Sequence, residues 1–288
     1  MNTRKLFPVV NDELTLNSVI AMIESGDLKL PVYDPVSLKI QEVLSNNSDD
    51  IDTIEKWVLA DQVLALEVLR AANSPFYCSI SPIRTIRHAI VRLGTRQLRR
   101  LIFLVSERMK YRSSYPDLQK LLLSFWRHSS VSALSAQWLS RRLRFTGIEE
   151  ICFLGGLLHD IGNLIIVQAI SEMRDNKMIP ASSSPEAIRD LLAAHHCRVG
   201  YNFLKRCDIS DIYCQIARDH HKMEFPTGDL TLAIVRLAVN GSMEVNDHGS
   251  SNFLTALSES PEANLLHVQE SILTEFQETL VEHIKMAA

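Results

Sequence analysis

Apolar residues recur at a spacing of three or four positions along most of this 288-residue chain. That spacing places them on one face of an α-helix. No segment shows the strict alternation of a half-buried strand, and only 10 glycines and 10 prolines are available for turns. Apolar residues make up 46% of the chain, which is enough for a large core. We therefore predict an all-α fold of several packed helices.

The helix boundaries are predicted from proline and glycine positions and from breaks in the apolar pattern. Proline suits the first turn of a helix, which places one helix start at Asp34–Pro35 and another at Pro116. Residues 147–170 are apolar nearly all round and are predicted to form one central helix. Residues 244–251 are polar and are predicted to form a loop. The other predicted helices span 13–24, 54–59 with Asp52 as the cap, 61–72, two parts of 79–112 separated at Gly94, 116–144, 186–207, 211–221, 230–243 and 270–286.

The cysteine content and the N-terminal sequence favour a reduced, intracellular environment. The five cysteines are odd in number and include no CxxC pair, so neither a disulfide framework nor a zinc knuckle is expected. The N-terminal segment lacks the apolar run of a signal peptide. The most apolar window, 151–170, is interrupted by His159, Asp160 and Asn163, so it is not expected to span a bilayer. We expect a cytoplasmic protein with no membrane partner.

Residues 79–112 carry a strong positive bias, with Glu107 as their one acidic residue. The formal net charge of the whole chain is only −4, so the bias is local. One explanation of this positive bias is a solvent-exposed helix face opposite an apolar face. The other is a surface that binds an anion or a protein partner. No aromatic residue lies between Arg92 and Arg100, so no nucleic-acid partner is expected. The arginines expected to share one helical face are Arg92, Arg96, Arg99 and Arg100.

Six histidines at suggestive positions lie between residues 128 and 221. They are His128, His159, the pair His195–His196 and the pair His220–His221, and His159 is followed by Asp160 within an apolar stretch. A carboxylate in such a stretch is costly unless it is paired or bound to a cation. Imidazoles that share a carboxylate suit zinc, iron or manganese. The alternative is that the histidines are core residues with satisfied hydrogen bonds.

Several separate elements of the sequence resemble those of one protein family. Gly155-Gly-Leu-Leu-His159-Asp160-Ile-Gly162 resembles the signature of the HD superfamily of metal-dependent phosphohydrolases. Four further elements resemble those of the HDOD family: Leu30-Pro31, Leu69-Arg-Ala-Ala-Asn73-Ser-Pro-Phe-Tyr77, residues 83–94, and Phe125-Trp126-Arg127-His128-Ser129. They occur in the family's order over roughly residues 28–240, so the chain is identified as a member of the HDOD family.

The resemblance implies a bacterial signal-transduction protein in which an HD-like helical lobe packs against a second helical lobe. Applied to this chain, it implies a leader helix at 1–27, an HDOD domain at 28–240, and a C-terminal loop and helix at 241–288. Within the domain, the N-terminal lobe would span 28–115 and the HD-like lobe 116–240. Most HDOD proteins are thought to be catalytically degenerate, so the metal ligands must be compared one by one.

For a first metal, the resemblance implies His128, His159, Asp160 and a later aspartate as ligands. Val239 replaces that aspartate in Arg236-Leu-Ala-Val239, which leaves the first site one anionic ligand short. For a second metal, the implied ligands are His196, His220 and His221, with Asp160 as the bridging ligand and, in an active enzyme, the catalytic one. His195 would take the place of His196 if the alignment of this sequence with the family pattern is shifted by one residue.

At two further positions the sequence differs from the pattern of the HD-GYP phosphodiesterases, which cleave cyclic dinucleotides. Ser124 stands where that group has a glutamate, one helical turn before the first histidine. Lys-Met-Glu-Phe-Pro follows His221, where that group has its Gly-Tyr-Pro element. Both departures disfavour hydrolysis of cyclic di-GMP, although they do not exclude its binding.

We therefore expect a regulatory HDOD protein with a degenerate metal site that binds a protein partner or a nucleotide. The alternative is an active metal-dependent phosphohydrolase on a nucleotide or phosphoester, with Arg127 or Lys222 offsetting phosphate charge. A third hypothesis is a structural or sensory ligand in the same site. The expected cofactor is a divalent metal (Fe, Mn, Zn, Ni or Mg), as one ion, two ions or none. The sequence does not predict the oligomeric state.

Overall fold

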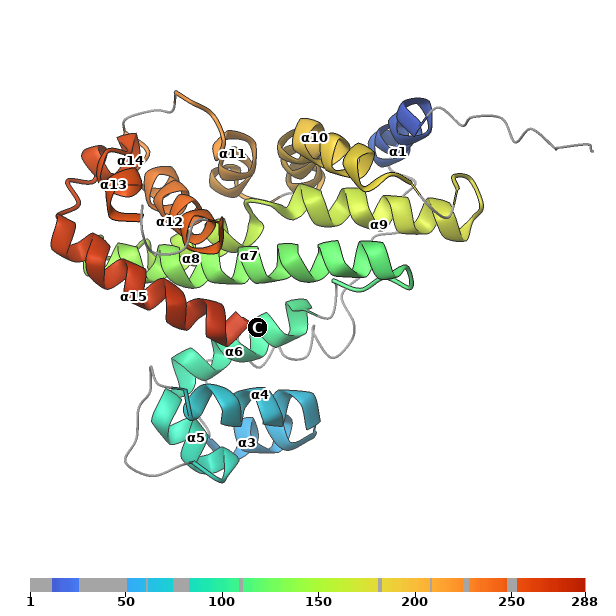
Figure 1. Ribbon diagram of the computed structural model, residues 1–288. Helices are drawn as coiled ribbons and strands as arrows, with labels where there is room; N and C mark the ends of the chain where they lie inside the picture. The colour runs from blue at the N-terminus through green and yellow to red at the C-terminus, as the bar shows by residue number, and fades with distance from the viewer. Residues whose placement is uncertain are drawn as a thin grey trace, which may run out of the picture.

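The computed structural model describes residues 12–25, 51–60, 62–74, 83–108, 111–180, 183–207, 209–224, 228–247 and 253–287. Every regular element within these ranges is an α-helix, which confirms the predicted all-α fold (Figure 1). The predicted helix start at Asp34–Pro35 lies outside the described residues. The helices are α1 (Asp12–Ser25), α3 (Ile51–Ala60), α4 (Gln62–Ala72), α5 (Ile86–Leu93), α6 (Thr95–Arg108), α7 (Pro116–Arg142), α8 (Glu149–Leu158), α9 (Ile161–Asp175), α10 (Pro185–Arg206), α11 (Asp211–Asp219), α12 (Leu230–Asp247), α13 (Phe253–Ser258), α14 (Pro261–Leu265) and α15 (Glu270–Ala287).

The long helix α7 is the axis of the larger group of helices (Figure 1). Pro116 and Asp117 occupy its first turn, where proline and a negative charge both favour a helix start. Its middle turns bury small side chains, among them Ser129, Ser132 and Ala133. Small side chains let neighbouring helices approach closely, and α8, α9, α12 and α15 all pack against α7.

Two apolar cores involve α7, and a third lies within α3–α6. The first core joins α7 to α1, α9 and α10 and includes the fully buried Ile166 and Ile170. The second joins α7 and α8 to α12–α15 and includes Phe253 and Phe276. The third core holds the smaller group α3–α6 together, with Ile90 among its buried side chains. The two cores around α7 fix the helices that carry the conspicuous histidines.

The asparagine of the element 69–77 has a structural role at the end of α4. The Asn73 side chain donates to the carbonyl oxygens of Leu69 and Ile83 and accepts from the Ile83 backbone N–H, at 2.9, 2.9 and 2.7 Å. These bonds fasten the end of α4 to the segment that leads into α5. Residues 75–77 of the same element lie outside the described part of the chain.

The prediction of one continuous helix over 147–170 is wrong, because the structure has two helices, α8 and α9, which meet at His159 and Asp160. Asp160 has φ −107° and ψ 18°, outside the helical region. Its carbonyl oxygen accepts from Asn163, three residues on, at 3.0 Å. No proline stands at this point and apolar residues continue on both sides of His159 and Asp160, so the pattern did not reveal the turn.

The stretch Glu149–Asp175 is long and apolar enough for a membrane span, and among the described residues it is the one that meets this test. However, 67% of its most apolar window is buried inside the protein. Its side chains contribute to the cores around α7, as expected of a central helical segment in a packed fold.

The C-terminal part of the chain also differs from the prediction. Helix α12 continues to Asp247, so the prediction of a loop at 244–251 is wrong for 244–247, and residues 248–251 lie outside the described part of the chain. The short helices α13 and α14 were not predicted, because five or six residues give too little periodicity to detect. Together with α15 they pack against α12, and α15 also packs along α7 (Figure 1).

Candidate metal centre

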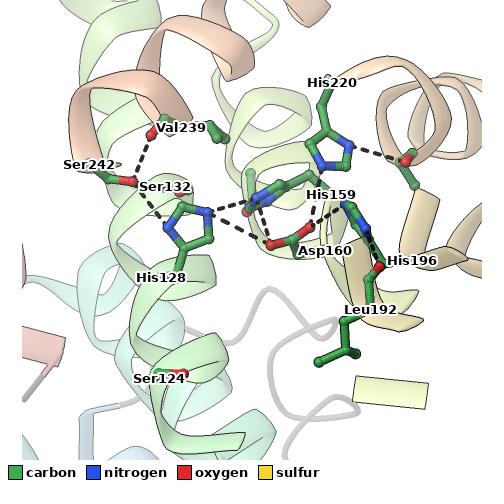
Figure 2. Close-up of polar contacts among 12 residues, drawn as sticks. Ser124, His128, Ser132, His159, Asp160, Leu192, His196, His220, Val239 and Ser242 are labelled. Carbon is green, nitrogen blue, oxygen red and sulfur yellow. Dashed lines mark hydrogen bonds and ion pairs between the residues drawn. The ribbon is translucent and has the colours of Figure 1, made fainter. Parts of the chain in front are cut away.

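Four histidines from four parts of the fold converge on Asp160. His128 lies on α7, His159 precedes Asp160 in the turn between α8 and α9, His196 lies on α10, and His220 ends α11. Figure 2 shows all four imidazoles pointing toward the Asp160 carboxylate. Three of these four histidines are buried, with His159 only 1% exposed. Residues far apart in the sequence therefore form one compact polar cluster within the apolar cores.

The nitrogen Nε2 of each imidazole lies close to one carboxylate oxygen of Asp160. Oδ1 is 3.3 Å from His220 Nε2 and 3.5 Å from His196 Nε2. Oδ2 is 3.5 Å from His159 Nε2 and 3.8 Å from His128 Nε2. The two oxygens thus face two separate pairs of histidines, with Asp160 shared between them.

The other ring nitrogen, Nδ1, is held by the protein in every case. Nδ1 of His159 donates to Gly156 O at 2.8 Å, and Nδ1 of His196 donates to Leu192 O at 2.8 Å. Nδ1 of His220 donates to the carbonyl oxygens of Ile216 and Ala217, at 3.2 and 3.1 Å. A carbonyl oxygen can only accept, so these three rings carry their N–H on Nδ1.

His128 is oriented by a serine that the sequence analysis missed. Ser242 Oγ donates its single proton to Val239 O at 2.8 Å, and it lies 3.2 Å from His128 Nδ1 (Figure 2). The hydroxyl oxygen therefore accepts from Nδ1, and the fourth ring has the same tautomer as the other three. The signal in the sequence was the spacing of Val239 and Ser242, which lie on one face of a helix at i and i+3.

In its neutral form, an imidazole with its proton on Nδ1 directs an unprotonated Nε2 into the cluster. His128 Nε2 and His159 Nε2 lie only 3.1 Å apart. Asp160 Oδ1 and His220 Nε2 are buried and make no hydrogen bond. Buried lone pairs that face one another are unfavourable unless a positive charge lies between them. The donor set is therefore complementary to a cation.

The spacing of these atoms also fits a metal ion. Nitrogen and oxygen ligands about 2.0–2.2 Å from a tetrahedral zinc ion lie about 3.4 Å apart. The distances from Asp160 Oδ1 to His220 and His196 are 3.3 and 3.5 Å. The arrangement fits the metal that the resemblance implies, with Nδ1 anchored in the way that metal-binding histidines commonly are.

The ionisation states favour the same chemistry. Burial lowers the pKa of His159 to about 3. Burial, followed by the neighbouring His220 and His196, lowers the pKa of His221 to about 4. Burial opposes ionisation of Asp160, but the surrounding His159, His220 and His128 outweigh it and hold the pKa of that carboxyl well below its usual value. Neutral imidazole and carboxylate are the forms that bind a metal.

The predicted ligand residues fall into two groups that share Asp160. One group is His128, His159 and Asp160, and the other is Asp160, His196, His220 and His221. His195 lies outside both groups, since its Nδ1 is paired with Arg198 at 3.4 Å. The structure thus brings together all six residues named from the sequence and places His196, rather than His195, in the cluster.

Two glycines of the Gly155–Gly162 motif allow the close packing that forms the cluster. A Cβ on Gly162 would lie 1.9 Å from the carbonyl oxygen of His196, and one on Gly156 would lie 2.7 Å from the carbonyl oxygen of Ser132. The first contact brings α9 onto α10, and the second brings α8 onto α7. The motif therefore supplies ligands and also the space in which they meet.

Arg236 holds the turn that carries His220, and the sequence analysis did not foresee this. Its guanidinium donates to the carbonyl oxygens of Asp219, His220 and Lys222, at 3.1, 3.1 and 2.5 Å. Its Nε donates to Glu262 on α14 at 2.6 Å, and both side chains are buried. The C-terminal segment is thereby connected to the polar cluster through one arginine.

The residues expected to mark a degenerate site lie as follows. Val239 is buried on α12, on the same face as Ser242 and hence beside His128. Ser124 is exposed, donates to Leu121 O at 2.7 Å and lies away from the cluster (Figure 2). Of the two cations considered for phosphate, Lys222 is paired with Asp219 at 2.7 Å, and Arg127 is exposed.

The prediction that four arginines share one helical face is wrong. Arg92 lies on α5, whereas Arg96, Arg99 and Arg100 lie on α6. Gly94, with φ +74°, separates the two helices and turns the chain. Arg92 and Arg99 are half-buried, and the side chains of Arg96 and Arg100 lie outside the described part of the chain.

A comparison with known protein families matches residues 30–223 to the HDOD domain. The chain belongs to the HDOD family. This confirms the family named from the motifs, and the match includes His128, His159, Asp160, His196 and the His220–His221 pair. The match ends before Val239 and Ser242, so the α12 side of the cluster lies beyond it.

Solved structures share the fold of this HDOD protein. An HDOD domain protein of unknown function from Geobacter sulfurreducens has a TM-score of 0.66 and 23% identity, covering 96% of this chain and 97% of that one. A protein named "Putative metal-dependent phosphohydrolase" from Shewanella amazonensis SB2B has a TM-score of 0.69 and 18% identity, covering 96% and 99%. At these identities the likeness concerns the fold alone.

A curated relative is an uncharacterized protein from Treponema pallidum (strain Nichols). It is 20% identical over 198 residues, which cover 67% of this HDOD chain. The matched part spans only 38% of the length of that relative.

Proposed function

We propose that this HDOD protein is a regulatory component of a signalling pathway and that it binds a divalent metal ion in the cluster around Asp160. It acts by binding a protein partner or a nucleotide and not by hydrolysis. The observation that carries the proposal is the convergence of four Nε2 atoms on Asp160, each ring held through Nδ1. So many anchored donors are more than the packing of a helical core requires.

The ligands divide unequally between the two halves of the proposed site. Asp160 with His196, His220 and His221 provides four donors, whereas Asp160 with His128 and His159 provides three. Val239 has no donor atom at the place where the family pattern has an aspartate. We therefore propose that the His196 half binds metal more tightly.

A divalent ion bound at this site would act as a Lewis acid toward a phosphoryl oxygen. Of the two cations considered for phosphate, Lys222 is already paired with Asp219 and is less available for substrate charge. This supports a binding role over turnover.

The test is hydrolysis of an aryl phosphate by protein loaded with Mn²⁺, Fe²⁺ or Ni²⁺, with Asp160→Asn as the matched variant. We expect the wild type to retain metal and to show no hydrolysis above the variant. Metal-dependent turnover that disappears in Asp160→Asn would overturn the regulatory proposal.

That second outcome would favour the other candidate function, a metal-dependent phosphohydrolase on a nucleotide or phosphoester. One observation favours it: a single carboxylate faces two separate pairs of imidazoles, as a bridging ligand of two metals would. In that function Asp160 would be the catalytic residue.

A further inference from the structure

One buried arginine holds the backbone from which His220 and His221 extend. Helix α11 ends at Asp219, and the last carbonyl groups of a helix have no partner within it. Arg236 Nη1 donates to three carbonyl oxygens here, those of Asp219, His220 and Lys222, at 3.1, 3.1 and 2.5 Å. These three carbonyl groups lie on both sides of His221 in the sequence. A single guanidinium therefore fixes the orientation of this turn.

His221 depends on this turn more than its neighbours do. The rings of His196 and His220 are anchored through Nδ1 to carbonyl oxygens. His221 is exposed and lies against those two rings, with centroids 5.2 and 4.2 Å apart. Its donor atom nevertheless lies within 4.8 Å of the other three donors of its group. The place of His221 in this group follows from the backbone that Arg236 holds.

Arg236 is itself held from the C-terminal part of the chain. Its Nε donates to Glu262 Oε1 at 2.6 Å, and Glu262 lies in the first turn of α14. The exposed fractions of the Arg236 and Glu262 side chains are only 9% and 2%. A buried charge is costly without its partner, so each of these groups holds the other in place. Both residues lie beyond residues 30–223, which match the HDOD domain.

We propose that Arg236 and Glu262 are positioning residues for the metal ligands His220 and His221. Glu262 on α14 thereby sets the metal affinity of the His196 half of the cluster. The proposal rests on the proposed metal binding and adds its regulation by the C-terminal part of the chain. Because such a coupling is reciprocal, bound metal should in turn strengthen the Arg236–Glu262 contact and slow the local opening of α14.

Two control positions on α15 distinguish positioning from general stabilisation. Glu275 also pairs with an arginine at 2.6 Å, but its partner Arg142 lies about 20 Å along α7 from His128. Glu275→Gln therefore repeats the chemical change of Glu262→Gln away from the ligands. Phe276 is fully buried in the core that joins α12 to α15. Phe276→Leu leaves a cavity there, which lowers the stability of the fold and leaves the Arg236–Glu262 pair in place.

The test is titration of the full-length, metal-free protein with Co²⁺, followed by its visible absorption, with folding verified by circular dichroism. Arg236→Lys keeps the positive charge but lacks the planar fork of donors, and Glu262→Gln removes the carboxylate charge at nearly constant size. Loss of a group that supports a metal ligand weakens binding about 10–100-fold, so both variants should bind Co²⁺ at least ~10-fold more weakly. The visible bands of bound Co²⁺ should also shift, because the imidazoles around it change direction.

The reciprocal effect is measured by hydrogen–deuterium exchange of residues 261–265 with and without Zn²⁺. We expect Zn²⁺ to slow exchange there in the wild type and in Glu275→Gln, and to have no such effect in Arg236→Lys. Exchange that is the same with and without bound Zn²⁺ in the wild type would contradict the coupling.

The outcomes separate this inference from the proposed function. A Co²⁺ affinity and spectrum equal to those of the wild type in Arg236→Lys and Glu262→Gln overturn the positioning role and leave metal binding intact. Equal weakening in Phe276→Leu would assign the effect to general loss of stability and overturn it as well. If the folded wild type binds neither Co²⁺ nor Zn²⁺, the proposed function fails together with this inference.

Discussion

His128 Nε2 and His159 Nε2 face each other at 3.1 Å, although both rings carry their proton on the opposite nitrogen, Nδ1. Gly156 O fixes the His159 tautomer and Ser242 fixes that of His128. In a metal-free protein this arrangement sets two lone pairs against each other at short range. It becomes favourable when a cation lies between the rings and Asp160.

Val239→Asp should strengthen metal binding in the His128 half of the cluster. The new carboxylate would lie one helical turn before Ser242, on the face of α12 that contacts His128. A buried carboxylate is costly without a cation, so the metal-free variant should melt at a lower temperature than the wild type. With metal, the gain in melting temperature should exceed that of the wild type.

The isosteric control is Val239→Asn, which adds polarity without charge. Without metal, Val239→Asn should also melt at a lower temperature than the wild type. With metal, its melting temperature should rise by less than that of Val239→Asp. Differential scanning calorimetry with and without Mn²⁺ checks both variants, and an identical response of Val239→Asp and Val239→Asn would exclude Val239 as a ligand position.

Gly162→Ala should destabilise the protein by at least about 2 kcal/mol, since overpacking in a close backbone contact forces helices apart. The added Cβ would lie 1.9 Å from the His196 carbonyl oxygen, so α9 and α10 must separate. The matched control is Gly228→Ala, where a Cβ would meet nothing within 4 Å and the change should stay within about 0.5 kcal/mol. Urea unfolding measures both, and equal stability of the two variants would refute the packing role of the motif.

Arg236→Met should cost about 3–5 kcal/mol, because it leaves the Glu262 carboxylate buried without its partner. Adding Glu262→Gln should restore part of that loss. The control is Arg142→Met, which breaks an exposed pair with Glu275 and should cost about 1 kcal/mol or less. Denaturant titration of the single and double variants checks this, and additive losses would contradict a coupled pair.

His283 should make the stability of the protein fall as the pH is lowered. Burial lowers its pKa from 6.5 to about 4, and its Nδ1 lies 2.9 Å from Ser135 Oγ between α15 and α7. Between pH 6.5 and 4 the unfolded chain binds a proton that the folded protein excludes. This single group should therefore cost up to about 1.4 kcal/mol per pH unit in that window.

The check is the stability of metal-free protein at a series of pH values, for wild type and His283→Gln. The variant should show a shallower loss of stability, while His88→Gln, at an exposed position on α5, should follow the wild type. Parallel curves for wild type and His283→Gln would refute this source of acid sensitivity.

The sequence predicted the fold class and most helices because their signals are local. Apolar spacing, Pro116 and Gly94 mark helix faces and ends without any tertiary information. The turn at His159–Asp160 gave no such signal, because no proline stands there and apolar residues continue on both sides of it. Local patterns could not reveal it.

The sequence predicted the candidate ligand residues of the site, but it did not predict the residues that hold those ligands in place. His128, His159, Asp160, His196, His220 and His221 were named from motifs, and the structure brings them together. Whether they bind metal stays a prediction. Ser242 and the Arg236–Glu262 pair were missed, since such contacts join helices whose packing the sequence pattern does not specify. The prediction of one arginine face was wrong for a local reason, since the turn at Gly94 places Arg92 on a different helix.

The most direct test of the account is the metal content of the full-length protein, purified without chelator or His-tag and measured by elemental mass spectrometry beside His159→Ala and Asp160→Asn. We predict a near-stoichiometric divalent metal in the wild type and a large loss in both variants, with all three proteins folded by circular dichroism. A folded wild type that contains no metal and takes up none on dialysis against Zn²⁺, Mn²⁺ or Fe²⁺ would contradict the claim that the cluster around Asp160 is built for a cation.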